Sequence, residues 1–206
     1  MAGGPPPAGG HGRVTKFCFK RAMVMAERAI EHTRQTGARK LAFIDVEASG
    51  LGSKSWPVEV GWAFEEGEPQ AFMIRPHDSW TDESWDPQAE RLHGLDRARL
   101  EREGLAPVEV CRALNEAFAG AEVYSDAPDW DGFWLFRLFS AAGVRQGFAL
   151  RDFAWLMRHF PRAHEAAVLA GAARLAPRRH RAAADARHLQ TLYRLARESC
   201  DPRLTP

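Results

Sequence analysis

Two carboxylates that stand two residues apart could bind a divalent cation. Asp45 and Glu47 end an apolar run, residues 40–47, which its Phe, Ile and Val side chains predict to be a buried strand. Because side chains alternate between the two faces of a strand, both carboxylates point the same way. Like charges on one face repel unless a positive charge lies between them. The pair therefore indicates a cation site, and an edge strand with one polar face is the alternative.

A histidine and an acid stand five residues apart near the end of the chain. His180 follows Pro177 in a predicted loop, and Asp185 lies in the first turns of a helix predicted over residues 182–197. A loop histidine can move and a helical acid is held rigidly, so the pair suits a mobile proton acceptor beside a fixed metal ligand. Taken alone, this spacing is more often that of a surface histidine near a helix start.

A third acidic segment contains Asp126, Asp129 and Asp131, where a strand runs through a turn into a helix. Asp131 stands where the helix begins. Asp126 and Asp129 lie in the turn and could equally cap the helix. The residue types alone do not choose among the three.

The elements that must position these side chains are of both kinds. Strands are predicted over residues 40–47, 58–64, 71–75, 121–125 and 147–150, the first three as an antiparallel meander. Helices are predicted over residues 17–35, 87–92, 107–118, 131–142, 153–159, 164–173 and 182–197. This mixed order predicts an α/β fold with helices packed on a sheet.

The 206 residues divide into a Gly- and Pro-rich flexible tail with an N-terminal helix (1–39), a folded domain (40–198) and a C-terminal tail (199–206). The formal net charge is +1, so nucleic-acid binding would have to be local. Residues 171–197 contain seven arginines and a single acid, Asp185. That segment could face phosphates, or it could be a solvated helix face.

The chain shows no sign of a disulfide framework or of a membrane anchor. Cys18, Cys111 and Cys200 are far apart and lack the CxxC spacing of zinc sites. The weakly apolar run 166–176 is shorter than the roughly 20 residues of a membrane span, and the N-terminus does not read as a secretory signal. We therefore expect a cytoplasmic protein without a membrane segment.

In the order and spacing of their motifs, residues 40–198 resemble the DnaQ-like DEDDh exonucleases, which include the proofreading subunit of bacterial replicative polymerases and RNase T. Residues 43–51, FIDVEASGL, are similar to the first motif, an apolar strand with Asp-x-Glu and a Thr/Ser-Gly-Leu turn. Residues 130–135, WDGFWL, look like the second motif and select Asp131. Residues 180–189, HRAAADARHL, resemble the third motif, and 57–61 (PVEVG) and 92–95 (LHGL) match further signatures. One departure is Ala127, where the family often has Asn.

The resemblance implies an RNase H-like fold, a mixed five-stranded sheet flanked by helices. It also implies a 3′-to-5′ exonuclease that uses two Mg²⁺ or Mn²⁺ ions to release nucleoside 5′-monophosphates from single-stranded 3′ ends of DNA or RNA. The metal ligands would be Asp45, Glu47, Asp131 and Asp185, with Asp45 bridging both ions, and His180 would be the general base.

The same resemblance suggests where substrate and partners would bind. Ser49, Gly50 and Leu51 would line the terminal-nucleotide pocket, with His93 and Trp130 as further candidates. Phe133 is a weaker one, and core packing is the commoner role for such aromatic residues. Attachment to a polymerase through the N-terminal helix and free action both stay open. The rival interpretation is a catalytically silent nucleic-acid- or polymerase-binding module, against which the intact acids and histidine argue.

Overall fold

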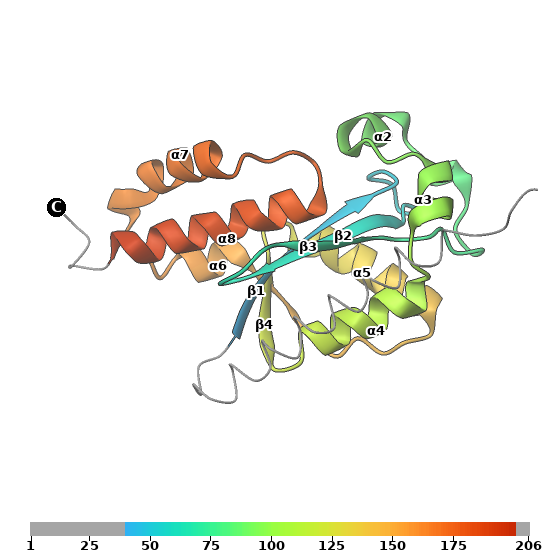
Figure 1. Cartoon of the computed structure of the whole chain (residues 1–206), viewed down its shortest axis with the longest axis horizontal. Helices are drawn as coiled ribbons and strands as arrows, with labels where there is room; N and C mark the ends of the chain where they lie inside the picture. Colours follow the sequence, from blue (N-terminus) through green and yellow to red (C-terminus); the bar gives the residue numbers. More distant parts are fainter. Residues whose placement is uncertain (1–39, 201–206) are drawn as a thin grey trace, which may run out of the picture.

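The computed structural model describes residues 40–200 (Figure 1). The predicted Gly/Pro tail and N-terminal helix (1–39), and residues 201–206 of the predicted C-terminal tail, lie outside the described residues. The domain boundaries therefore stay predictions. No helix within residues 40–200 has the length and apolar character to cross a membrane.

Five strands form one mixed sheet in the order β3-β2-β1-β4-β5. They are β1 (Lys40–Ala48), β2 (Pro57–Phe64), β3 (Gln70–Met73), β4 (Ala121–Ser125) and β5 (Leu150–Asp152). β1, β2 and β3 are the predicted antiparallel meander, and β4 and β5 continue the sheet parallel to β1. The expected mixed five-stranded sheet is confirmed, with β1 at its centre.

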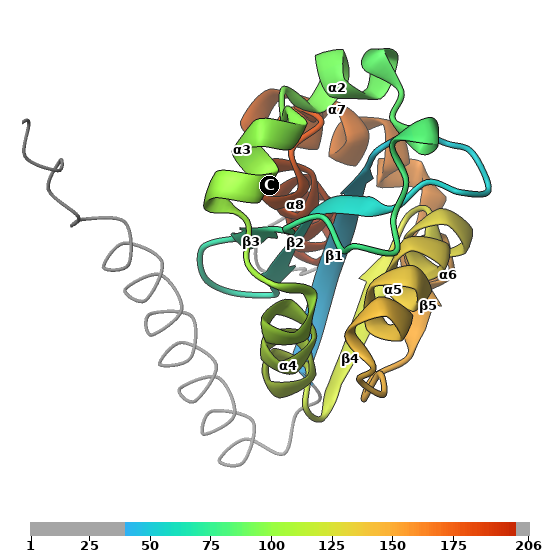
Figure 2. The ribbon, with the colours of Figure 1, turned by 90° about the vertical axis from the view of Figure 1, so that its right-hand side faces the viewer.

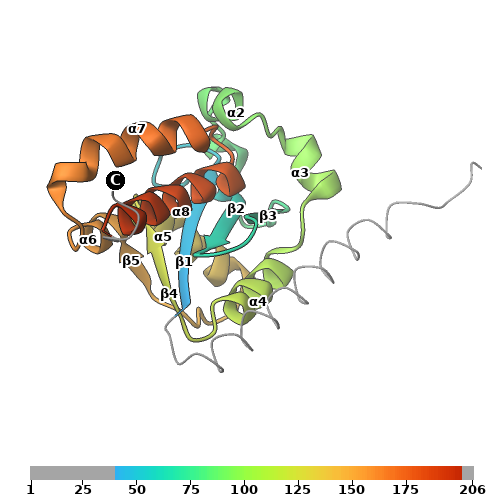
Figure 3. The same ribbon diagram turned by 60° about the vertical axis from the view of Figure 1, so that its left-hand side comes forward.

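Helices cover both faces of this sheet. They are α2 (Pro87–His93), α3 (Arg97–Glu103), α4 (Pro107–Ala117), α5 (Pro128–Ala142), α6 (Phe153–Met157), α7 (Glu165–Leu175) and α8 (Ala182–Ser199), with single 3₁₀ turns at Asp82–Ser84 and Arg162–His164. Figure 2 shows α4 and α5 in front of the strands, and in Figure 3 α8 crosses in front of β1 with α7 beside it. The two faces are therefore closed by different helices.

The period-two alternation of β1 divides the interior into two cores. Ala42, Ile44 and Val46 belong to the larger core, which β1 shares with α4 and α5. Leu41 and Phe43 belong to the smaller core, which is completed by residues of α7 and α8. Asp45 and Glu47 continue the Leu41–Phe43 row, so both carboxylates lie on the face that α8 covers.

One helix was missed, and the boundaries of several elements differ from the sequence expectation, most of all those of α5 and β5. Helix α3 was not predicted, because Leu100 is its single buried side chain and no apolar period marks it. Helix α5 begins at Pro128 rather than at residue 131, since proline fits the first turn of a helix. Strand β5 begins at Leu150, beside Val123 of β4, whereas the predicted strand began at Gly147.

Candidate functional site

The centre of the site is the carboxyl end of β1, where the strand places Asp45 and Glu47 on one face. Asp45 pairs across the antiparallel ladder with Gly61 of β2, and Glu47 pairs with Glu59. Residues directly opposite in such a ladder project to the same side of the sheet. Three carboxylates and one bare glycine therefore form a patch beneath the start of α8.

Gly61 allows α8 to approach this patch. A Cβ at Gly61 would lie 2.2 Å from the carbonyl carbon of Ala182 and 2.3 Å from the backbone nitrogen of Ala183. Any other residue would therefore displace the first turn of α8. That turn carries Asp185, whose side chain is buried and accepts a hydrogen bond from the backbone N–H of Arg179 at 2.8 Å.

The approach of α8 brings His180 and Asp185 of the predicted third motif close to Glu47 of the first. One side-chain ligand atom each of Glu47, His180 and Asp185 lie within 4.8 Å of one another. His180 is exposed in the loop before α8 and has a backbone φ of 51°, a conformation uncommon for a residue other than glycine. A strained histidine at the rim of a buried acid cluster is a frequent feature of functional sites.

Asp131 enters the cluster from the first turn of α5. Its side chain is 2% exposed, and its Oδ2 accepts a hydrogen bond from the Ser125 hydroxyl. Ser125 in turn accepts from the backbone N–H of Ala127 at 2.9 Å. The family's usual Asn is Ala127 here, and the buried Ser125 supplies the side-chain hydrogen bonding of this turn. Reasoning from the sequence missed Ser125, although its position at the end of β4 was visible.

The electrostatics show that the carboxylates crowd one another. Burial raises the pKa of Asp45 well above its ordinary value, and the charges of Asp131, Glu47 and Asp185 raise it further. Burial also raises the pKa of Glu47 from 4.5 to about 7, with the charge of Asp185 adding to the effect. The pKa of Asp131 is raised from 3.8 to about 7 by burial, against the opposing hydrogen bond from Ser125.

Two nearby arginines act on these acids only weakly: the charge of Arg181 lowers the pKa of Glu47 and that of Arg178 lowers the pKa of Asp131, in each case as the smallest contribution. Within residues 40–200, none of Asp45, Glu47, Asp131 and Asp185 forms an ion pair with a lysine, arginine or histidine. Buried charges are normally paired or bind metal. Carboxylate oxygens are the ligands that hard divalent cations prefer, so the donor set fits Mg²⁺ or Mn²⁺.

A fifth acid, Glu59, is compensated in full. Its side chain is 3% exposed, and it accepts hydrogen bonds from Arg181 Nη2 at 2.6 Å, Arg181 Nε at 3.0 Å and the backbone N–H of Ala182 at 2.9 Å. Arg181 directly follows His180, so this bidentate contact anchors the histidine loop to β2. Both segments stand in motifs that the sequence shows, but nothing in one sequence connects positions 59 and 181.

The turn acids that competed with Asp131 are both exposed, and neither caps α5. Asp126 instead pairs with Arg178. Five of the seven arginines in residues 171–197 form ion pairs with acids. Phosphate contact is therefore not needed to explain the charge of this segment.

The predicted terminal-nucleotide residues divide by exposure, and three of them are buried. Ser49 is 1% exposed, and its hydroxyl accepts a hydrogen bond from the backbone N–H of Trp56. A Cβ on Gly50 would lie 3.1 Å from the Cβ of Asp86. His93 is 3% exposed, and burial lowers its pKa. These residues shape the loop after β1 from within.

Leu51 and Trp130 present apolar surface beside the acids. Leu51 is 69% exposed and follows the carboxyl end of β1. Trp130 is 42% exposed, precedes Asp131 and stacks on the buried Trp134 with ring centroids 5.5 Å apart. Phe133 meets Trp130 edge to face and is partly buried. A base could reach Leu51 and Trp130 without rearrangement of the core.

No protein-family model and no curated protein sequence matches this chain. Among solved structures, the chain is similar to Exonuclease I of Methylocaldum szegediense, with a TM-score of 0.60 and 19% identity. Two E. coli Exonuclease I structures, one in complex with a dT13 oligonucleotide and one a zinc-bound complex with single-stranded DNA, give TM-scores of 0.60 and 0.58 at 16% identity. Each of these three alignments covers 81% of this chain and 42% of the other.

The chain thus spans less than half the length of these proteins. The likeness shows the fold: a mixed sheet in the order 3-2-1-4-5 flanked by helices, RNase H-like as in Exonuclease I. The resemblance to DnaQ-like DEDDh exonucleases is confirmed at that level, and the roles of the individual site residues stay predictions.

Proposed function

We propose that this protein is a metal-dependent 3′-to-5′ exonuclease that releases nucleoside 5′-monophosphates. The observation that supports it most is the convergence of four carboxylates, from β1, α5 and α8, none of which forms an ion pair within residues 40–200. The exonuclease fold and the order of the three motifs support the same activity. The role that we propose for each residue is based on where its side chain lies.

Asp45, Glu47, Asp131 and Asp185 would hold two divalent cations, either Mg²⁺ or Mn²⁺. Such a pair of ions neutralises a scissile phosphate and lowers the pKa of a bound water. Asp45 lies at the centre of the mutual repulsion, since the other three acids all raise its pKa, so its carboxylate would gain most from holding the cations. The Ser125 hydroxyl holds Asp131 in one orientation, and the Arg179 N–H holds Asp185.

His180 would accept the proton of the attacking water. It lies at the rim of the cluster within reach of Glu47 and Asp185, and imidazole is the side chain whose ordinary pKa lies nearest neutrality. The Glu59–Arg181 contact fixes the next residue, so the loop cannot carry His180 far from the acids. Exposure lets the ring pass its proton to solvent after each cleavage.

The substrate would be the 3′ end of a single strand. Leu51 and Trp130 flank the acids with exposed apolar surface, on which a terminal base could stack. The Exonuclease I structures that share this fold include complexes with dT13 and dA16 oligonucleotides. Either a ribose or a deoxyribose chain would suit these two contacts, so both DNA and RNA belong in the test.

The test is digestion of 5′-labelled single-stranded DNA and RNA by the full chain with Mg²⁺ or Mn²⁺. We expect stepwise shortening that EDTA stops. Asp45→Asn should lower the rate by roughly a thousandfold or more, because several kcal/mol of charge stabilisation depend on the ions. Asp129→Asn, an exposed acid in the first turn of α5, is the matched control and should leave the rate unchanged.

No shortening with either ion would reject this proposal in favour of a catalytically silent binding module. Activity of Asp45→Asn near that of Asp129→Asn would reject the metal site even if the wild-type chain cuts. An unfolding midpoint of Asp45→Asn equal to or above that of Asp129→Asn would show that the loss arises from the site and not from the fold.

A further inference from the structure

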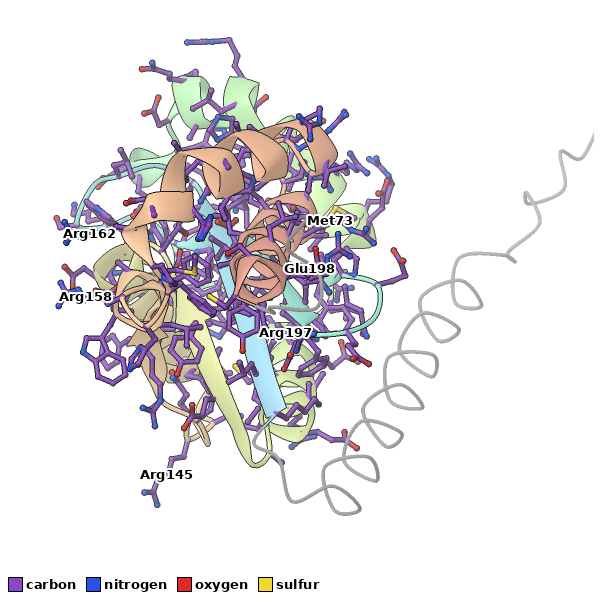
Figure 4. The ribbon with its side chains drawn as sticks, turned by 90° about the vertical axis from the view of Figure 1, so that its left-hand side faces the viewer. Met73, Arg145, Arg158, Arg162, Arg197 and Glu198 are labelled. Carbon is purple, nitrogen blue, oxygen red and sulfur yellow. The ribbon has the colours of Figure 1, made fainter. Side chains whose placement is uncertain are left out.

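A cavity of about 760 Å³ lies between α6, α7 and α8, apart from the acid cluster. Its size is within the roughly 300–1,000 Å³ of sites that bind small molecules and nucleotides. Figure 4 views the molecule from the side on which these three helices lie. Nothing in the three motifs assigns a use to this cavity.

The floor of the cavity is apolar and partly aromatic. Phe153 of α6, Val168 of α7 and Leu189 and Leu192 of α8 line it, and all four also pack in the smaller core beneath β1. Leu169 lines it as well, yet is 51% exposed. A flat ring entering the cavity would therefore meet an apolar surface that the fold already holds rigid.

Two arginines at the rim form no ion pair in the described part of the chain, although the acid Glu165 also lines the cavity. They are Arg158 and Arg162, and both are exposed. In Figure 4 they project from the same side of the molecule. This contrasts with the arginines of residues 176–200, all but Arg179 of which are paired with acids.

One end of the cavity lies towards the acid cluster, although none of the four acids lines it. Asp126 and Arg178, which pair with each other, both line the cavity. The charge of Asp126 also acts on Asp45 and on Asp131. A strand that leaves the acids along this border would pass directly to Arg158 and Arg162.

We propose that this cavity binds the segment of single-stranded nucleic acid that lies 5′ of the end being cut. The apolar floor would receive a base, and Arg158 and Arg162 would contact backbone phosphates, the combination by which proteins hold single strands without regard to sequence. The inference rests on the proposed exonuclease activity for the direction of the strand. It adds a binding site outside the residues that perform cleavage.

The charge of the rim favours this occupant over an apolar peptide. A hydrophobic segment would leave two unpaired guanidinium groups at the edge of its binding site without partners, whereas a phosphodiester backbone supplies a negative charge for each. The position of one end of the cavity towards the acid cluster points the same way, because a protein segment in the cavity would gain nothing from that position.

The experiment measures binding of a labelled single strand of about 20 nucleotides by the full chain in the Asp45→Asn background, with Mg²⁺ present. Arg158→Glu combined with Arg162→Glu should raise Kd at least about tenfold. It should also reduce the slope of log Kd against log salt by about 1.4, since each phosphate contact on a single strand contributes about 0.7. Arg145→Glu, an exposed arginine that Figure 4 shows at another edge of the molecule, is the control.

A second variant tests the floor. Leu169→Glu places a negative charge in the cavity at a position that is already half exposed, so folding should survive, and Kd for the long strand should rise several-fold. In chains with Asp45 intact, hydrolysis of a dinucleotide should stay within about twofold of wild type for every cavity variant, because a dinucleotide is too short to occupy both sites.

The two proposals fail in different ways. If the double arginine variant and Leu169→Glu both keep the Kd and the salt slope of Arg145→Glu, the cavity does not bind the strand and this inference is overturned, while exonuclease activity stands. If the wild-type chain cuts nothing yet the cavity variants lose affinity for the long strand, the cavity site is upheld and the proposed activity is rejected.

Discussion

Glu47 and Glu59 are direct cross-strand neighbours on one face of the sheet. Glu59 is ion-paired with an arginine, whereas Glu47 has no ion-pair partner within the described residues. Glu59 accepts three hydrogen bonds, two of them from the guanidinium of Arg181. The pKa of Glu47 is raised to about 7. The protein can therefore neutralise a buried carboxylate at this place, and at Glu47 it does not.

We interpret this difference as a division of roles: Glu59 positions the start of α8, and Glu47 belongs to the acids of the proposed metal site. Glu59 joins β2 to the start of α8 and so fixes where His180 and Asp185 lie. Glu47 and the three other acids accumulate repulsion that an external cation would relieve. A buried charge without a partner lowers stability, and such sites persist where function requires them. Each prediction below changes one side of this contrast.

The largest effect in this series is expected from His180→Ala, which removes the predicted base and leaves the four carboxylates. We expect kcat to fall about 10²- to 10⁴-fold, the usual contribution of general base catalysis, while the Mn²⁺ concentration for half-maximal rate stays within about threefold. Titration of activity against Mn²⁺ measures both quantities. His77→Ala, in the loop before the first 3₁₀ turn, is the control.

His180 also lies within ligand distance of Glu47 and Asp185, which gives this measurement a second use. A large rise in the Mn²⁺ concentration for half-maximal rate, in step with the loss of kcat, would identify His180 as a metal ligand. His180 would then be grouped with the four acids as a metal ligand, and its proposed role as general base would be rejected.

A smaller effect is expected from Arg181→Ala, which leaves Glu59 buried without its guanidinium. We expect kcat to fall about 10- to 100-fold with KM little changed, as for other residues that orient a metal site from outside it. Unfolding by urea should cost about 2 kcal/mol less, a value reduced from that of fully buried pairs because the Arg181 side chain is 39% exposed.

Arg187→Ala is the matched control. Arg187 lies in α8, the helix that Arg181 precedes, and it pairs with the exposed Glu68. Its loss should change stability by less than about 0.5 kcal/mol and leave kcat unaltered. Arg181→Lys should recover part of the lost kcat by restoring one charge without the bidentate geometry. Equal behaviour of Arg181→Ala and Arg187→Ala would mean that the buried contact does not position the histidine loop.

The sequence was sufficient to predict where the side chains of the acid cluster lie. The period of two in β1 placed Asp45 and Glu47 on one face, and the spacing of His180 and Asp185 placed one in a loop and the other in a helix. Such local periodicity survives without tertiary information. The α/β class followed from the order of strands and helices in the same way, and the mixed five-stranded sheet from the resemblance to the exonuclease family.

The positioning side could not be predicted, because it depends on contacts between distant segments. Glu59 and Arg181 are far apart in the chain, and the need for glycine at position 61 appears only when α8 lies against β2. Ser125 looked like any strand residue until its hydroxyl met Asp131. Helix α3 escaped notice for a related reason, since charged pairs such as Arg97–Glu101 and Arg99–Glu103 support it rather than an apolar face.

The smallest effect is expected in the stability of the metal-free protein at different pH values. The pKa of Glu47 is raised from 4.5 to about 7 and that of Asp131 from 3.8 to about 7, so between these values the folded chain binds more protons than the unfolded chain. The free energy of unfolding should therefore fall as pH rises from about 4 to about 7. Urea denaturation in EDTA at pH values across this range measures the slope.

Glu47→Gln and Glu59→Gln should then move stability in opposite directions. Glu47→Gln removes an unfavourable buried charge, so it should flatten the pH dependence and raise stability above pH 7 by about 2 kcal/mol, less than the full shift implies because Glu47 is not completely buried. Glu59→Gln should lower stability by about 1–2 kcal/mol over the same range, because Arg181 loses its charged acceptor. If both substitutions shifted stability in the same direction, Glu47 would be stabilised by the protein as Glu59 is. The argument that the acid cluster binds an external cation would then be rejected.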